Sequence, residues 1–382
     1  MSSLSKNYQD KTVTGPVATR LVIPDVLRWR SRVYAIIGLI VLLIVVVLFT
    51  VNLGSVRIPF STSFGVLLSQ LPFIDITPAM PQGFDAQNYQ EVLYTLVIDT
   101  RLPRIILAGL VGAALAVAGA TYQGLFRNPL ADPYLIGVAS GAGLGATIAF
   151  LLPITVSSLL FGIVPLFALI GGIATVMVVY WLARVGKTLP STTLILAGVA
   201  MSAFLLSITS YLMTVSGEEL HGILFWLLGG LSMTEWAEVK VVLPCVIIGI
   251  AIIWVHARPL NVMQLNEEQA QQLGINVERV KLTLLAAATL ITAGAVSFTG
   301  LIGFVGIIVP HIVRLIWGPD HRFLIPLSIL VGAIFLILAD TLAHSLMSPY
   351  EVPVGIVTAF LGAPFFLYLL RRKKQITFFR EV

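Results

Sequence analysis

The side chains that carry out catalysis or bind metals are few in this sequence and form no recognised pattern. The single cysteine, Cys245, excludes a disulfide framework and a cysteine-based metal cluster. No His-Glu-x-x-His motif and no nucleophile elbow occurs. Five histidines show no metal-ligand spacing: His221, His256, His311, His321 and His344. We therefore expect no catalytic residue, no metal site and no bound cofactor in this chain.

One short segment, Gly186-Lys187-Thr188, imitates the end of a phosphate-binding loop. That motif requires a glycine five residues before Gly186, and this position is Trp181. The sequence therefore lacks a nucleotide-binding signature. If the protein uses ATP, we expect another subunit to hydrolyse it, so the chain by itself is not expected to be an enzyme.

Asp340 is the one carboxylate deep in a long apolar run. An acid inside a membrane-spanning segment is a functional candidate, because placing it in lipid is costly. Asp340 could equally bond a neighbouring helix or the backbone, and the sequence does not separate these roles. A lone acid argues against a proton-driven pump, which needs a relay of titratable groups.

The segment 261–280 has the pattern of a short capped helix between two apolar runs. Asn266 can cap this helix, and Gly274 lies where a helix ends on a left-handed residue. A second helical turn can begin at Asn276, which would give a helical pair. We expect a docking element for a partner rather than a loop on the membrane surface, formed by Asn266, Glu267, Glu268, Gln269, Ala270, Leu273 and Gly274.

The elements that position these residues follow from the composition. Only 11% of the 382 side chains are charged and the mean hydropathy is +0.98, whereas a globular chain has about 25% charged residues. About 20 apolar residues cross a membrane core. We predict an all-α integral membrane protein with a tail at 1–32, a transmembrane domain at 33–370 and a tail at 371–382. Its ten spans are 33–53, 103–123, 134–152, 159–183, 192–213, 239–256, 281–300, 301–317, 323–344 and 352–370.

The orientation follows from the basic residues, which stay on the cytoplasmic side. With the N-terminus inside, 19 of the 23 basic residues fall in internal segments. The long segment 54–100 is then external, and a short re-entrant or surface helix is expected within it. Both termini are predicted to be cytoplasmic.

A faint internal repeat is visible in the second and seventh spans. Ala118-Gly119-Ala120 is echoed by Ala293-Gly294-Ala295, five spans later and therefore in the opposite direction. Inverted repeats are typical of transporters. We expect an inverted repeat of five helices.

Several ordered motifs between residues 101 and 370 resemble those of one transporter family. They are Leu102-Pro103-Arg104 and the segments 124–133, 303–314, 318–322, 353–358 and 361–365. The chain resembles FecCD/BtuC-like permease subunits of type II ABC importers, which carry iron-siderophores, haem and cobalamin. Only the N-terminal tail and the first external loop lie outside the resemblance.

The resemblance implies a set of partners. A multi-pass permease of the bacterial or archaeal plasma membrane would work with a second permease copy, most simply as a homodimer. Two ABC ATPase subunits, which bind ATP and Mg, would lie below it in the cytoplasm. A substrate-binding protein would dock from outside, and no nucleic acid is expected.

The resemblance also implies roles for particular residues. The coupling helices of the family lie between spans six and seven, where the docking element falls. The external residues that pair with acidic groups of the binding protein correspond to Arg101, Arg104 and His344. The cytoplasmic gate corresponds to Ser140, Ser191 and Thr192, with Ser140 replacing an amide residue of the relative.

The resulting hypothesis is an importer subunit that translocates a metal chelate, with ferric siderophore favoured and cobamide or haem next. The alternative is an ion- or proton-coupled secondary transporter acting alone, which would need several intramembrane ionisable groups. A membrane enzyme would need a catalytic constellation that the sequence lacks.

Overall fold

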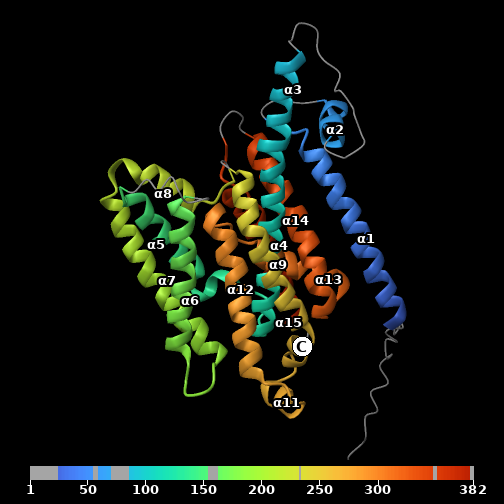
Figure 1. The fold of residues 1–382 in the computed structure, drawn as a ribbon. Helices are drawn as coiled ribbons and strands as arrows, with labels where there is room; N and C mark the ends of the chain where they lie inside the picture. Colours follow the sequence, from blue (N-terminus) through green and yellow to red (C-terminus); the bar gives the residue numbers. More distant parts are fainter. Residues whose placement is uncertain are drawn as a thin grey trace, which may run out of the picture.

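The structure is a computed structural model that describes residues 25–54, 59–69, 86–153, 162–231, 234–346 and 351–378. These residues form helices joined by turns, and their only extended pairing is an isolated bridge between Val185 and Thr188. The helices pack side by side in a bundle (Figure 1). The all-α fold class is confirmed.

Within the described ranges, ten apolar helices form the bundle, and each overlaps one of the ten predicted spans. Seven are long enough to cross a membrane: α1 (Asp25–Thr50), α4 (Leu102–Leu125), α6 (Ile163–Ala183), α7 (Ser191–Thr214), α9 (Trp236–Val255), α12 (Val277–Thr299) and α14 (His321–Leu346). Three have shorter apolar stretches: α5 (Val138–Leu151), α13 (Val305–Trp317) and α15 (Val354–Phe378). The prediction of a multi-pass membrane protein is confirmed.

The first helix begins earlier than predicted. Helix α1 starts at Asp25, inside the segment expected to be a polar tail. Arg32, in the first part of α1, connects this helix to the end of α13. Its Nε donates to Trp317 O at 3.0 Å, and its guanidinium lies 3.8 Å from Asp320. Burial alone would raise the pKa of Asp320, but hydrogen bonds from Arg322 and Asn261 and the charge of Arg322 lower it to about 2.

The second span also begins earlier than predicted. The segment 54–100 contains α2 (Phe60–Leu68) and α3 (Ala86–Tyr94), and α3 continues through the π-helix η1 (Thr95–Arg101) into α4. Pro103 suggests a helix start, because proline lacks an N–H and crowds the carbonyl four residues earlier. The wider π-helical turn accommodates it. The short helix expected within 54–100 is present as α2, whereas α3 is an extension of the second span.

The centre of the bundle is made by α4 and α12. In their most apolar windows, 83% and 72% of the residues are buried. Helix α4 approaches α14 so closely that a Cβ on Gly112 would overlap the carbonyl of Gly332, and the reverse is also true. Small residues permit this backbone contact, which stabilises helix pairs where lipid offers no hydrophobic driving force.

The two halves of the chain correspond element by element. The second helix of each half, α4 and α12, is the most buried of its half, and the third, α5 and α13, is short. Both short helices follow a residue with left-handed backbone, Gly137 at φ 89° and Phe304 at φ 68°. This correspondence supports the predicted repeat.

The bundle has two distinct ends. Helices α10 (Ala257–Met263) and α11 (Glu267–Gln272) connect α9 to α12 at the end where α1 begins and α15 finishes, which we call the inner end (Figure 1). Helices α2, α3 and α8 (Leu220–Leu227) lie at the opposite, outer end.

Candidate functional site

The predicted docking element is a capped helix, α11. Asn266 Oδ1 accepts a hydrogen bond from Glu267 N at 2.8 Å, and Gly274 has a φ of 82°. Both cap predictions are confirmed. The second helix of the predicted pair is wrong, because Asn276 caps the long helix α12 by accepting from Arg279 N at 3.1 Å. The short neighbour of α11 is instead α10.

Helix α11, with the residue that follows it, exposes several polar side chains and one leucine. Ala270 anchors it and is fully buried, whereas Glu268 and Gln269 are exposed. Leu273, just after the helix, is 66% exposed. An exposed leucine beside charged and amide groups on a short rigid helix suits a protein partner, although its coupling role stays a prediction.

A buried lysine connects α11 to two other elements. Lys281, in α12, has 2% of its side chain exposed, and its Nζ lies 2.7 Å from Glu267 Oε2 and 3.5 Å from Glu278 Oε1. Lys281 Nζ also donates to Leu189 O at 3.0 Å, and Leu189 N donates to Glu278 Oε2 at 3.0 Å. We call Lys281, Glu267, Glu278 and the backbone of Leu189 the inner cluster. It joins α11, the start of α12 and the segment two residues before α7.

Sequence reasoning missed the inner cluster and treated Lys281 only as an internal basic residue. One local signal existed, since Lys281 follows Glu278 by three residues and two such residues are neighbours on a helix. The contact between Lys281 and Leu189 joins residues that are 92 positions apart, and no local pattern in the sequence indicates it.

A second charge cluster lies at the outer end. Arg104, in the first turn of α4, donates from Nε and Nη2 to the two oxygens of Asp340 at 2.9 and 3.0 Å. Arg104 Nη1 donates to Glu351 Oε1 at 3.0 Å, and His344 Nδ1 lies 2.9 Å from the same oxygen. We call Arg104, Asp340, His344 and Glu351 the outer cluster. It joins α4, α14 and the segment just before α15.

The outer cluster corrects the expectation for Asp340. This residue lies six positions before the end of α14, so it is near the outer end and not deep in the span. Its charge is matched by a two-point contact with the Arg104 guanidinium, a strong form of charge-assisted hydrogen bond. Of the two roles left open, bonding to a neighbouring helix is the one that this geometry supports.

The predicted docking residues all lie at the outer end, but they are engaged within the chain. Arg101 donates from Nη1 to Val51 O at 2.6 Å. Arg104 is 16% exposed and His344 is 24% exposed, and both contact Glu351. Their role in docking is untested.

The predicted gate residues do not meet within one chain. Ser140 Oγ donates to Gly137 O at 3.0 Å, and it lies within hydrogen-bond distance of Ser202 Oγ, at 3.2 Å. Ser191 and Thr192 open α7, ten or eleven residues before Ser202, which places them about 15 Å away along the helix axis. A gate made of these three residues requires contributions from more than one chain.

Several helices in the described part of the chain expose apolar faces, and α1 is the most exposed of the long ones, with 11% of its most apolar window buried. Only 17% of the most apolar window of α7 is buried, and its exposed residues include Phe204, Leu206 and Tyr211. On α15, Phe360 is 78% exposed and Leu367 is 65% exposed. Lipid or a second protein chain must cover these faces.

The described residues contain no group of three or more His, Cys, Asp or Glu side chains that could hold a metal ion. Polar contacts in the core join helices to one another. Gln123 Oε1, for example, accepts from Arg314 Nη2 at 2.9 Å, while Gln123 Nε2 donates to Gly306 O at 3.1 Å. These contacts tie α4 to α13.

Comparison with known proteins places these features in context. The FecCD transport family matches residues 42–372. The cobalamin import system permease protein BtuC of Halobacterium salinarum is 46% identical over 303 residues, covering 79% of this chain and 80% of that protein. The hemin transport system permease protein HmuU of Yersinia pestis is 36% identical over 350 residues, covering 88% of this chain and 95% of that protein.

A solved structure supports the same relation. A structure described as an inward-facing conformation of a metal-chelate type ABC transporter is similar with a TM-score of 0.74 and 30% sequence identity. The match covers 88% of this chain and 98% of that one. Sequence and fold therefore agree over nearly the whole membrane domain.

Proposed function

This chain belongs to the FecCD transport family, and from that premise we propose that it is the permease of a type II ABC importer that carries a metal chelate into the cytoplasm. The family consists of transport permease subunits and not of catalytic enzymes. The observation that carries the proposal for this chain is α11, an exposed capped helix connected through a buried lysine to the segment just before α7.

The inner cluster offers a route for coupling. Two partner ATPases would bind ATP with Mg²⁺ and contact α11 in each of two permease copies. Movement of α11 would carry Glu267, and Lys281 would follow because the two groups are 2.7 Å apart. Lys281 also holds Leu189 O. The displacement therefore reaches Ser191, the first residue of α7.

A second copy of the chain completes the proposed pathway. The exposed apolar faces of α7 and α15 suit a subunit contact, in which van der Waals packing against the partner copy would replace contact with lipid. Ser140, Ser191 and Thr192 would then form the gate where the two copies meet. Cross-linking of single cysteines at exposed α7 positions such as Phe204, in a Cys245→Ala background, should trap a dimer. Absence of any cross-link along α7 would contradict this arrangement.

The outer end would receive the substrate-binding protein. Arg101 and Arg104 lie three residues apart, so they share one side of the helix that crosses this end. A planar guanidinium binds a carboxylate at two points. Acidic groups of the binding protein would compete with Asp340 and Glu351 for Arg104, and with Val51 O for Arg101.

We propose that the inner end faces the cytoplasm, because of the asymmetry of the basic residues. The test uses cysteines at Ser61, in α2, and at Gln375, in α15, each in a Cys245→Ala background. An impermeant reagent should label intact cells at position 61 and not at 375. Equal labelling from outside would contradict the ten-span orientation.

The identity of the transported chelate is the most specific part of the proposal. Ferric siderophore remains the first candidate, and the relatives named for cobalamin and haemin put cobamide and haem beside it. Proteoliposomes that contain the chain, its ATPases and its binding protein should accumulate one chelate from a labelled panel only with ATP. Gradient-driven uptake by the chain alone would instead favour a secondary transporter. The pairing of Asp340 with Arg104 weakens that alternative, because Asp340 was its main support.

A further inference from the structure

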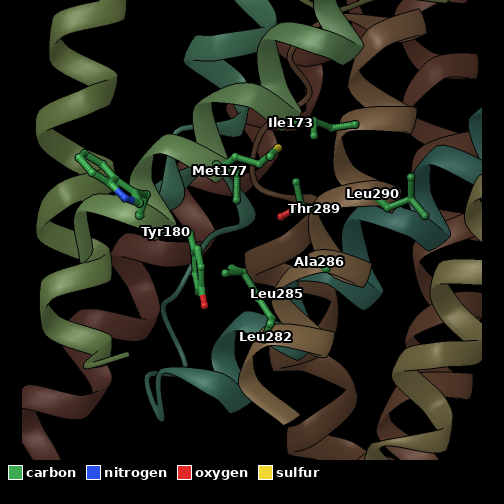
Figure 2. Close-up of a pocket in the computed structure, with 10 residues that line it drawn as sticks. Ile173, Met177, Tyr180, Leu282, Leu285, Ala286, Thr289 and Leu290 are labelled. Atoms are coloured by element: carbon green, nitrogen blue, oxygen red, sulfur yellow. The ribbon is translucent and has the colours of Figure 1, made fainter. Parts of the chain in front are cut away.

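A groove of about 610 Å³ runs between α6 and α12. Residues 173–181 of α6 and 282–290 of α12 form its walls, and Figure 2 shows Met177 and Tyr180 facing Leu285 and Thr289 across it. The walls are almost entirely apolar. The Thr289 hydroxyl is already bonded to Tyr122, with 3.2 Å between the two oxygens. The groove therefore suits a hydrocarbon chain.

The length of the groove along the helix axes is close to the thickness of one membrane leaflet. Each wall covers eight residue steps, which correspond to about 12 Å along a helix, and half of a bilayer core is about 15 Å. The walls belong to the last half of α6 and the first half of α12. Both stretches lie toward the inner end, because Leu189, six residues after α6, contacts Lys281 near the start of α12.

The mouth of the groove is basic on both sides. Arg184 directly follows the last residue of α6, four residues after Tyr180, and Arg279 precedes Leu282 by one turn on α12. Both arginines are exposed. Arg184 uses one of its five N–H groups, Nε, to reach Gly186 O at 3.0 Å. Among the described residues, the Arg279 side chain has no hydrogen-bond or ion-pair partner within the chain.

The acid next to this mouth does not cancel the positive charge. Glu278 directs one carboxylate oxygen to Lys281 Nζ and accepts from Leu189 N with the other. Its charge is therefore matched inside the inner cluster. The two guanidinium groups remain to face the solvent or a ligand at the membrane surface.

We propose that this groove binds an anionic phospholipid, with an acyl chain between α6 and α12 and the headgroup phosphate at Arg184 and Arg279. Basic pockets between helices on the cytoplasmic side recognise such headgroups. Trp181, 74% exposed, lies beside Tyr180 at the level where aromatic side chains meet headgroups. Only the assignment of the mouth to the cytoplasmic leaflet rests on the proposed function.

The test measures contact between lipid and Trp181 in the full-length chain reconstituted in nanodiscs. Brominated acyl chains quench nearby tryptophans, and the difference between wild type and Trp181→Phe isolates the signal of Trp181. Brominated phosphatidylglycerol is titrated against brominated phosphatidylcholine. We expect a ten- to thirtyfold preference for phosphatidylglycerol, because each basic residue near the surface contributes roughly a fivefold preference.

The double variant Arg184→Gln with Arg279→Gln should bring the preference close to one. A matched control, Arg30→Gln with Arg371→Gln, removes the same charge from exposed positions on α1 and α15 and should leave the preference unchanged. Equal quenching by both lipids in wild type would overturn the proposal, as would no quenching, which would mean that protein covers the groove. The measurement needs no substrate, ATPase or binding protein, so its failure is distinct from failure of the proposed importer function.

Discussion

The inner and outer clusters share one plan at opposite ends of the molecule. In each, a cation near the start of the buried second helix of one half lies between two carboxylates: Lys281 on α12 and Arg104 on α4. Each cation is connected to the segment that precedes the fifth helix of the other half, at Leu189 before α7 and at Glu351 before α15. An inverted repeat produces this exchange.

The clusters differ in what they hold together. Arg104 grips Asp340 at two points, and both residues belong to core helices that are in backbone contact at Gly112 and Gly332. The inner cluster includes a carboxylate from α11, a short helix outside the core. The outer cluster therefore joins two helices of the core, whereas the inner one joins the core to α11, the helix that moves in the proposed coupling, and to the segment before α7.

The largest effect is expected at the inner cation. Lys281→Met leaves Glu267 and Glu278 without their shared partner, and breaking a buried pair costs about 3–5 kcal/mol before the partial exposure of these carboxylates reduces it. ATP-driven uptake should fall by more than about tenfold, which corresponds to 1.4 kcal/mol. The control Lys187→Met removes an exposed lysine from the segment between α6 and α7 that contains Leu189, and it should have little effect.

Adding Glu267→Gln and Glu278→Gln to Lys281→Met separates folding from coupling. The triple variant removes the unpaired charges, so membrane expression should recover, but uptake should stay low because the link to Leu189 is missing. Normal uptake in the triple variant would show that the inner cluster is only structural.

The next effect is expected at the end of α11. Proline fixes φ near about −65°, and Gly274 has a φ of 82°. Gly274→Pro should therefore disrupt the helix end and reduce binding-protein-stimulated ATP hydrolysis to the basal rate. Gly217→Pro, at φ 56° in an outer-end turn with open space around it, is the matched control. Stimulation that survives in Gly274→Pro would place coupling elsewhere.

A smaller effect is expected for docking at the outer end. Arg101→Glu should weaken binding-protein affinity by about tenfold at low ionic strength and less at high salt, because surface charge pairs are screened. Arg101 is a cleaner test than Arg104, whose reversal would also repel Asp340 and Glu351. Lys240→Glu, at an exposed position, alters a different basic residue predicted on the same face and serves as control. Equal affinities at low salt would mean that Arg101 only stabilises the loop at Val51.

The smallest effect is expected at His344. His344→Gln keeps a hydrogen-bond donor for Glu351 while removing a titratable group, and partly exposed pairs contribute about 0–1 kcal/mol. Binding-protein affinity should change by less than about threefold, measured in the same assay. A larger change would indicate that His344 contacts the binding protein directly.

Local patterns were enough to predict the parts of the site that are local. The caps at Asn266 and Gly274 depend on side chains within a few residues, and the spans depend on continuous apolar runs. The same local reading failed at Asn276, because the first turn of a long helix and a separate short helix look alike. It also failed at Pro103, where a π-helical turn lets the helix continue.

Contacts between distant positions could not be predicted in this way. Arg104 and Asp340 are 236 positions apart, and Lys281 and Leu189 are 92 apart. Which oxygen meets which nitrogen depends on how whole helices rotate and cross in the bundle. The sequence marked Asp340 as unusual but left its partner open, and it gave Lys281 no special weight.

The continuous helix of α3, η1 and α4 has a consequence for the height of the molecule above the membrane. Its forty residues correspond to about 60 Å of helix, twice the roughly 30 Å of a bilayer core. Figure 1 shows α3 rising beyond the outer ends of the other long helices. Two copies of the chain would have two such protruding helices. A protein that binds at the outer end would have to fit between or around them. Their shape would therefore restrict its orientation before any charge pair forms.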